Sequence, residues 1–74
     1  MPRLTPLAAR KVIKKLERAG FIFARQRGSH ISMKNKAGVI VVIPDHGAKE
    51  IPIGTLHEII TKQAKLRVEA FLKL

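Results

Sequence analysis

FIFARQR (21–27), HISMK (30–34) and VIVVI (39–43) are the three runs of residues that decide the fold of this chain. Each is rich in β-branched or aromatic residues, or alternates between apolar and polar residues, as is typical of strands. Gly28-Ser29 and NKAG (35–38) separate them, and both are turn sequences. Three strands joined by two short turns predict an antiparallel meander.

The middle run predicts how the sheet is covered. Residues 30–34 alternate between apolar and polar side chains, so Ile31 and Met33 share one face while His30, Ser32 and Lys34 share the other. An antiparallel sheet commonly packs one face on a core and leaves the other to solvent or a partner. We expect the face that carries His30 to be the open one.

Helical patterns lie before and after the strands. Thr5-Pro6 is a typical helix start, and Gly20 a typical helix stop. After a loop at 44–47, Pro52 or Thr55 could open a second helix, and the tail at 66–74 is either a third short helix or its continuation. The pattern predicts one α+β domain over residues 1–74, with α-β-β-β-α order, helices on one face of a three-stranded antiparallel sheet and a short C-terminal helix.

Charge is the strongest compositional signal. The chain carries 15 Lys and Arg against five Asp and Glu, a formal net charge of +10. Ten of the basic residues and only one acid lie in residues 1–38. Such an asymmetry favours a polyanionic partner, because each neutralised phosphate releases counterions. A solvated basic surface and attraction to acidic lipid are the alternatives.

Several classes of protein are disfavoured. The chain has no cysteine, and its longest apolar run is residues 39–43, far short of a membrane span. The N-terminus lacks the apolar core of a signal peptide. We therefore expect a soluble cytoplasmic protein that is not bound to a membrane.

The possible catalytic groups are few. No His, Asp or Glu cluster has the spacing of metal ligands, and the serines lack evident acid and base partners. His30 is the exception, because Arg25 and Arg27 lie just across the turn and Lys34 shares its strand face. An imidazole beside phosphate-binding cations can exchange protons near neutral pH. Taken alone, such a histidine is more often a surface or hydrogen-bonding residue.

The chain resembles the HicA (YcfA-like) family of messenger-RNA-cleaving toxins from toxin–antitoxin pairs. The resemblance runs in one register over nearly the whole chain, and it rests on Gly20-Phe21, Arg25-Gln26-Arg27-Gly28-Ser29-His30, Ile43-Pro44-Asp45-His46-Gly47, Lys49-Glu50-Ile51, Gly54-Thr55-Leu56, Ile59-Ile60, Lys62-Gln63-Ala64 and Val68-Glu69-Ala70-Phe71-Leu72.

The resemblance implies a fold like that of double-stranded-RNA-binding domains and a catalytic histidine at His30. It also implies action without a cofactor, and silencing by a HicB-like antitoxin that covers the active face. We expect no metal site, since no ligand cluster is present, and no small-molecule ligand. The residues expected to bind RNA are Arg25, Arg27, Gly28, Ser29, Lys34 and Lys36.

Other residues are assigned less directly. His46 matches a family position and is either a second proton carrier or part of a loop in which Asp45 caps a turn. His57 is expected at the surface, and the three phenylalanines in the core.

The sequence departs from the family's pattern at two places. Ile31 stands where many relatives have a second histidine, and alternation gives it a packing role. Lys65-Leu66-Arg67 replaces a Gly-Ile-Ser that ends one helix and caps the next, which puts the break between the last helices in doubt.

Two functions follow from these features, ahead of a third, a DNA-binding partner of a regulator, against which the A-form shape preference of this architecture argues. The first is a metal-independent endoribonuclease in which His30 assists attack by the RNA 2′-OH. The second is a non-catalytic module that binds structured RNA through the same surface, for which His30 would be dispensable.

Overall fold

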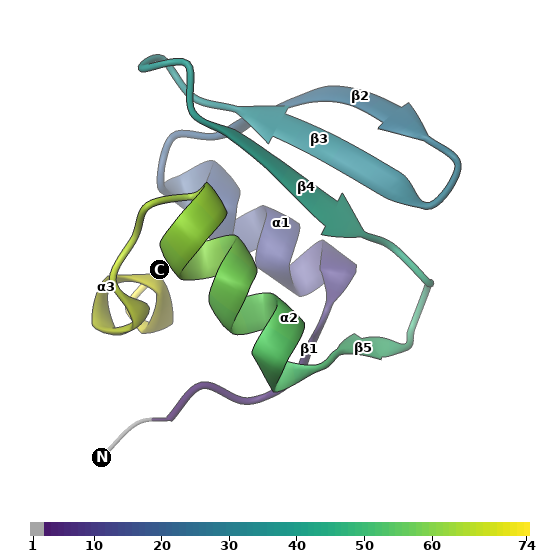
Figure 1. Ribbon diagram of the computed structural model, residues 1–74, viewed down its shortest axis with the longest axis vertical. Helices are drawn as coiled ribbons and strands as arrows, with labels where there is room; N and C mark the ends of the chain where they lie inside the picture. Colours follow the sequence, from purple (N-terminus) through teal and green to yellow (C-terminus); the bar gives the residue numbers. More distant parts are fainter. Residues whose placement is uncertain (1–2) are drawn as a thin grey trace.

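The computed structural model describes residues 3–74 and confirms the α+β architecture (Figure 1). In chain order the elements are β1 (Leu7–Ala8), α1 (Ala9–Arg18), β2 (Ile22–Arg27), β3 (His30–Lys34), β4 (Ile40–Pro44), β5 (Glu50–Ile51), α2 (Ile53–Glu58), the π-helical turn η1 (Ile59–Gln63) and α3 (Val68–Leu72). No helix within this part of the chain is long and apolar enough to cross a membrane.

The three long strands form the predicted antiparallel meander in the order β2-β3-β4. The β2–β3 hairpin turns through Gly28-Ser29, where Gly28 has a φ of 55° and Ser29 a negative φ. A positive φ at the first of two turn residues is the pattern of a type II′ turn, which suits the twist of a hairpin. The strand at His30–Lys34 has the bounds predicted from its alternation.

The helices cover one face of this sheet, as predicted (Figure 1). Ile31 and Met33 of β3 and Val41 and Ile43 of β4 are buried against Val12 and Leu16 of α1 and against Leu56, Ile59 and Ile60 of α2 and η1. The packing role predicted for Ile31 is confirmed. Burial of this single apolar layer supplies most of the stabilisation that so small a domain can gain.

One of the three phenylalanines does not belong to the core. Phe21 and Phe71 are buried, but Phe23 is 57% exposed, so the core position expected for it is wrong. All six residues of β2 are exposed because the helices do not extend over this edge strand. A β-bulge between Phe23 and Arg25 further distorts its pairing with β3.

The first helix begins later than Thr5-Pro6. Its first residue is Ala9, and Leu7 and Ala8 are extended and pair with Ile51 and Glu50 in a small separate sheet. Pairing of the backbone with β5 overrides the local capping signal. The predicted stop at Gly20 is confirmed, because Gly20 has a φ of 98° and the Phe21 N–H donates to the Leu16 carbonyl, as in a Schellman cap.

The two edges of the main sheet differ. At the β4 edge the Val42 N–H donates to Oε1 of Gln63 (2.8 Å), so a side chain from η1 occupies a position that another strand would take. At the β2 edge no further strand pairs within residues 3–74. The β2 edge is therefore the accessible one.

The break between the last two helices is present despite the missing glycine. Lys65 has a φ of 58°, the left-handed conformation that glycine usually supplies after a helix. The Leu66 N–H then donates to the Ile60 carbonyl (2.9 Å), which closes η1, and α3 follows as a separate helix. The backbone between η1 and α3 thus adopts the left-handed conformation even though a lysine, which is strained there, takes the place of glycine.

We expect Lys65→Gly to stabilise the protein. A left-handed residue with a side chain costs about 1–2 kcal/mol, and the entropy cost of glycine returns part of that gain. The free energy of unfolding in urea should therefore rise by about 0.5–1 kcal/mol. As a matched control, Lys62→Gly inside η1 should lower it by about 1 kcal/mol. Equal losses in both variants would show that the conformation of Lys65 carries no strain.

Candidate functional site

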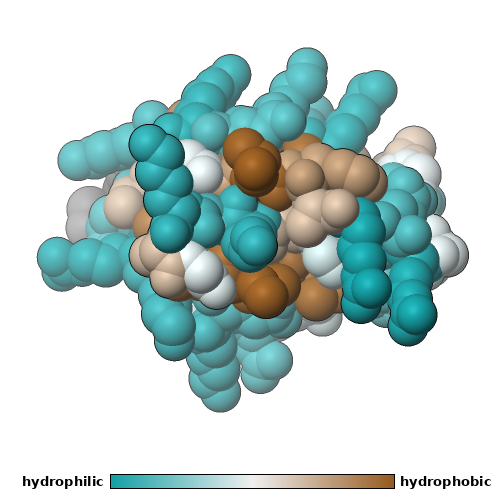
Figure 2. Space-filling model, turned by 90° about the horizontal axis from the view of Figure 1, so that it is seen from above, coloured by the Kyte–Doolittle hydropathy of each residue, from teal (hydrophilic) through white to brown (hydrophobic). Residues whose placement is uncertain are grey.

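The face of the sheet opposite the helices is open to solvent, and we call it the open face. Its side chains form three rows across the strands, in each of which the residues are direct cross-strand partners. The rows are Arg27–His30–Pro44, Arg25–Ser32–Val42 and Ile22–Lys34–Ile40. Figure 2 looks at the molecule from above, from the sheet side, and shows apolar atoms in the middle with long hydrophilic side chains around them. The open face thus combines cations with exposed apolar surface.

His30 lies at the hairpin end of this face. It is the first residue of β3, is exposed, and stands directly opposite Arg27 of β2. The Asp45 N–H donates to the Ser29 carbonyl (2.6 Å), which ties the loop after β4 to the hairpin. This bond fixes the backbone immediately before His30 to the loop after β4.

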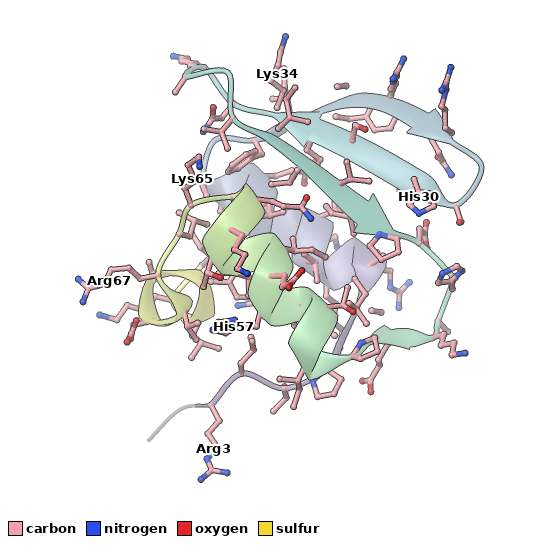
Figure 3. The ribbon with its side chains drawn as sticks, in the orientation of Figure 1. Arg3, His30, Lys34, His57, Lys65 and Arg67 are labelled. Carbon is pink, nitrogen blue, oxygen red and sulfur yellow. The ribbon has the colours of Figure 1, made fainter. Side chains whose placement is uncertain are left out.

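Lys34 lies at the other end of β3 (Figure 3). Four residues of strand at about 3.3 Å each separate the two Cα atoms by about 13 Å. The structure therefore places Arg27 beside His30, Arg25 one row away and Lys34 two rows away. The expected cations share one face but do not converge on one point.

The loop at 45–49 carries His46. The Gly47 N–H donates to Oδ1 of Asp45 (3.0 Å), so the predicted turn-capping role of Asp45 is confirmed. His46 is exposed and follows Pro44, the β4 partner of His30, by two residues. It lines a hollow of about 280 Å³ with Lys49, Glu50 and Thr55, which His30 does not line. The two histidines lie at the same end of the sheet, in adjoining segments.

Arg10 joins this end of the molecule. It stands in the first turn of α1 and lines a second hollow, of about 330 Å³, with Asp45, Gly47 and Ala48. Sequence reasoning did not single out Arg10, because nothing in a helical stripe tells which cation faces a loop 35 residues later. The packing of α1 under the sheet supplies that information.

The basic first helix reaches the His30 end of the sheet through Arg10, and its other cations do not line the hollows found there. It lies in the helix layer, on the side of the sheet away from the open face (Figure 1). Nζ of Lys15 donates to the carbonyls of Leu74 (3.1 Å) and Phe71 (3.5 Å) and lies 5.3 Å from the centroid of the Phe71 ring. This lysine holds the C-terminal helix, a structural role that its charge alone does not reveal.

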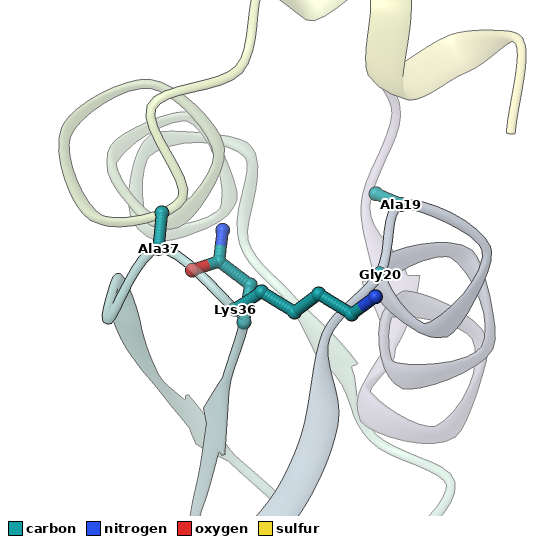
Figure 4. A pocket seen from close by; sticks show the side chains of 5 residues that line it. Ala19, Gly20, Lys36 and Ala37 are labelled. Atoms are coloured by element: carbon teal, nitrogen blue, oxygen red, sulfur yellow. The ribbon is translucent and has the colours of Figure 1, made fainter.

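Lys36 is also remote from His30. It belongs to the turn between β3 and β4, and its side chain runs across a hollow of about 400 Å³ toward Gly20 at the end of α1 (Figure 4). Ala19, Asn35 and Ala37 complete the lining. Of the residues expected to bind RNA, Lys36 is the one placed farthest from the hairpin.

The remaining titratable groups are dispersed. His57 is exposed on α2, as expected (Figure 3). Among residues 3–74, no three His, Asp or Glu side chains lie close enough together to hold a metal ion. The one ion pair found in the same residues joins Lys62 to Glu58 (3.9 Å), so the cations of the open face have no acidic partner there.

Comparison with known proteins gives one family. The family model described as the HicA toxin of bacterial toxin–antitoxin systems matches residues 9–66, which span all three long strands and the helices packed on them. No curated protein matches the chain.

We expect Lys15→Ala to destabilise the protein and Lys14→Ala to leave its stability unchanged. Hydrogen bonds from a charged group to the end of a helix stabilise by about 1–2 kcal/mol, and Lys14 is exposed without such contacts in the described residues. Urea unfolding of both variants measures the difference. Equal stability of the two would remove the structural role of Lys15.

Proposed function

Because the chain belongs to the HicA toxin family of bacterial toxin–antitoxin systems, we propose that it is an endoribonuclease that cleaves messenger RNA with His30. Membership of this family supports a toxin role and implies an antitoxin partner. The proposal takes residues 1–74 as one catalytic domain of a type II system, acting in the cytoplasm where its substrate is found. The observation that carries it is the exposed His30 directly opposite Arg27 on an otherwise uncovered cationic face.

The chemistry requires little of the protein. RNA carries its own nucleophile, the 2′-OH, which attacks the adjacent phosphorus and displaces the 5′-oxygen of the next nucleotide. A general base takes the proton of the 2′-OH, and a general acid gives one to the leaving oxygen. The products are a 2′,3′-cyclic phosphate and a free 5′-OH. His30 serves as one of these groups, and Arg27 stabilises the charge that develops on the phosphate oxygens.

The second proton carrier is His46 in this proposal. Lys34 and water are the other candidates. The Cα atom of Lys34 is about 13 Å along the strand from that of His30, so the two side chains could contact one phosphate only if the lysine side chain folded back toward His30. His46 lies at the same end of the sheet, beyond the residue paired with His30. Gly28 and Ser29 let the β2–β3 turn approach the RNA backbone closely. Lys34 and Lys36 bind phosphates farther along the RNA strand.

We expect cleavage to require His30 and no metal ion. His30→Ala should lower the rate of cleavage of a defined single-stranded RNA by about 10²-fold or more, the usual effect of removing an acid–base group. EDTA should not change the rate of the wild type. His57→Ala is the matched control, because this histidine is equally exposed but lies on α2, and it should cleave at the wild-type rate.

The opposite pattern separates the alternatives. Loss of cleavage in EDTA would contradict the metal-free mechanism. RNA binding without cleavage by the wild type, unchanged in His30→Ala, would identify a non-catalytic RNA-binding module.

We propose that a HicB-like antitoxin covers the open face with carboxylates opposite Arg25 and Arg27. Charges of this kind mainly set the rate of association. The double variant Arg25→Glu/Arg27→Glu should therefore bind the antitoxin at least about 10-fold more slowly at low salt. Lys11→Glu/Lys14→Glu, which makes the same charge change on α1, should have a much smaller effect.

RNA and antitoxin should also exclude one another. A ternary complex that binds RNA at full affinity would place the inhibited surface elsewhere.

A further inference from the structure

The open face contains a small hollow that neither the catalytic step nor the family match explains. It has a volume of about 260 Å³ and is lined by Ala24, Arg25, Ser32, Lys34 and Ile40. The β-bulge in β2 creates it, because the register shifts between Phe23 and Arg25 and leaves Ala24 as an extra residue. A methyl group at Ala24 and a hydroxymethyl group at Ser32 fill little of the space between the second and third rows.

The lining has two kinds of chemistry. Ile40, 56% exposed, and Ala24 give the hollow apolar lining, while Arg25 and Lys34 add two cationic side chains to it. Ser32 is half-buried, and its hydroxyl makes no hydrogen bond to another of residues 3–74. This hydroxyl can therefore both donate a hydrogen bond to a ligand and accept one from it.

The size and position of the hollow indicate part of a polymer. Pockets that hold whole small molecules usually have volumes of about 300–1,000 Å³, so this one suits a single ring system that enters from a longer chain. Its nearest residue on β3, Ser32, lies one row from His30, a distance of about 7 Å along the strand. That is the reach of a neighbouring nucleotide.

We propose that this hollow binds one base of single-stranded RNA and that Ser32 is a specificity-determining residue. The inference rests on the proposed nuclease function and deepens it. The base lies against Ile40 and Ala24 and stacks on the guanidinium plane of Arg25, which takes the place of an aromatic ring because none lines the hollow. The Ser32 hydroxyl hydrogen-bonds the edge of the base, and Lys34 binds the next phosphate. The bound base belongs to a nucleotide that flanks the cut.

The test is the sequence preference of cleavage. The wild-type chain is incubated with a random-sequence single-stranded RNA, and the ends of the products are sequenced. We expect a base preference at one position flanking the cut, which Ser32→Ala weakens by about 3- to 10-fold, the effect of one hydrogen bond. Ala24→Leu, which fills the hollow from an exposed position on an edge strand, should abolish the same preference. Thr5→Val removes an exposed hydroxyl from the N-terminal segment and should leave the preference intact.

The outcomes distinguish this subsite from the nuclease itself. RNA cleavage with an unchanged preference in Ser32→Ala and Ala24→Leu would overturn the subsite and leave the nuclease standing. If the wild type does not cleave RNA, the proposed function fails. The subsite is then tested by binding to oligonucleotides of A, C and U, among which Ser32→Ala must discriminate less than the wild type. Equal binding of all three by the wild type, with Ser32→Ala weakening only the antitoxin complex, would assign the hollow to the protein partner and overturn the proposal.

Discussion

The structure depends on the alternation of β3 between a covered and an uncovered face. Ile31 and Met33 hold the sheet to the helices, and the same backbone periodicity presents His30, Ser32 and Lys34 to solvent. A slip by one residue would exchange the two sets and bury three polar or charged groups without partners, which costs several kcal/mol for a charge. A domain this small cannot absorb that cost, so the requirement to fold and the requirement to display the site select the same register.

Residues from the neighbouring strands make the two ends of the open face different. The hairpin end gathers Arg27, His30 and the loop at 45–49, with Arg10 approaching from α1. The far end carries Lys34 and Lys36 beside exposed apolar residues. This arrangement fits the proposed ribonuclease, in which His30 at one end would react while cations along the rest of the face would hold an extended RNA strand.

Much of this arrangement could be predicted from local patterns. The bounds of β3, the meander, the buried face and the exposed His30 all follow from alternation and turn residues. The features that could not be predicted depend on contacts between distant residues. The start of α1 is set by pairing with β5, the exposure of Phe23 by the limited reach of the helices, and the role of Lys15 by the position of the C-terminus. The left-handed Lys65 is of the same kind, because its sequence argues against the break that the packing of α3 requires.

The net charge of +10 has more than one use in this protein. Lys15 serves the fold, whereas the cations of β2 and β3 have no acidic partner in the described part of the chain. We propose that RNA binds the open face and not the basic helix. Backbone amide chemical shifts of the full chain test it most directly, on titration with a single-stranded RNA whose 2′-OH groups are replaced by hydrogen to prevent cleavage. RNA bound to the open face should shift the resonances of β2, β3 and residues 45–48, with Arg10 the one position affected in α1. Shifts concentrated in Lys11–Arg18, with β3 unaffected, would contradict it.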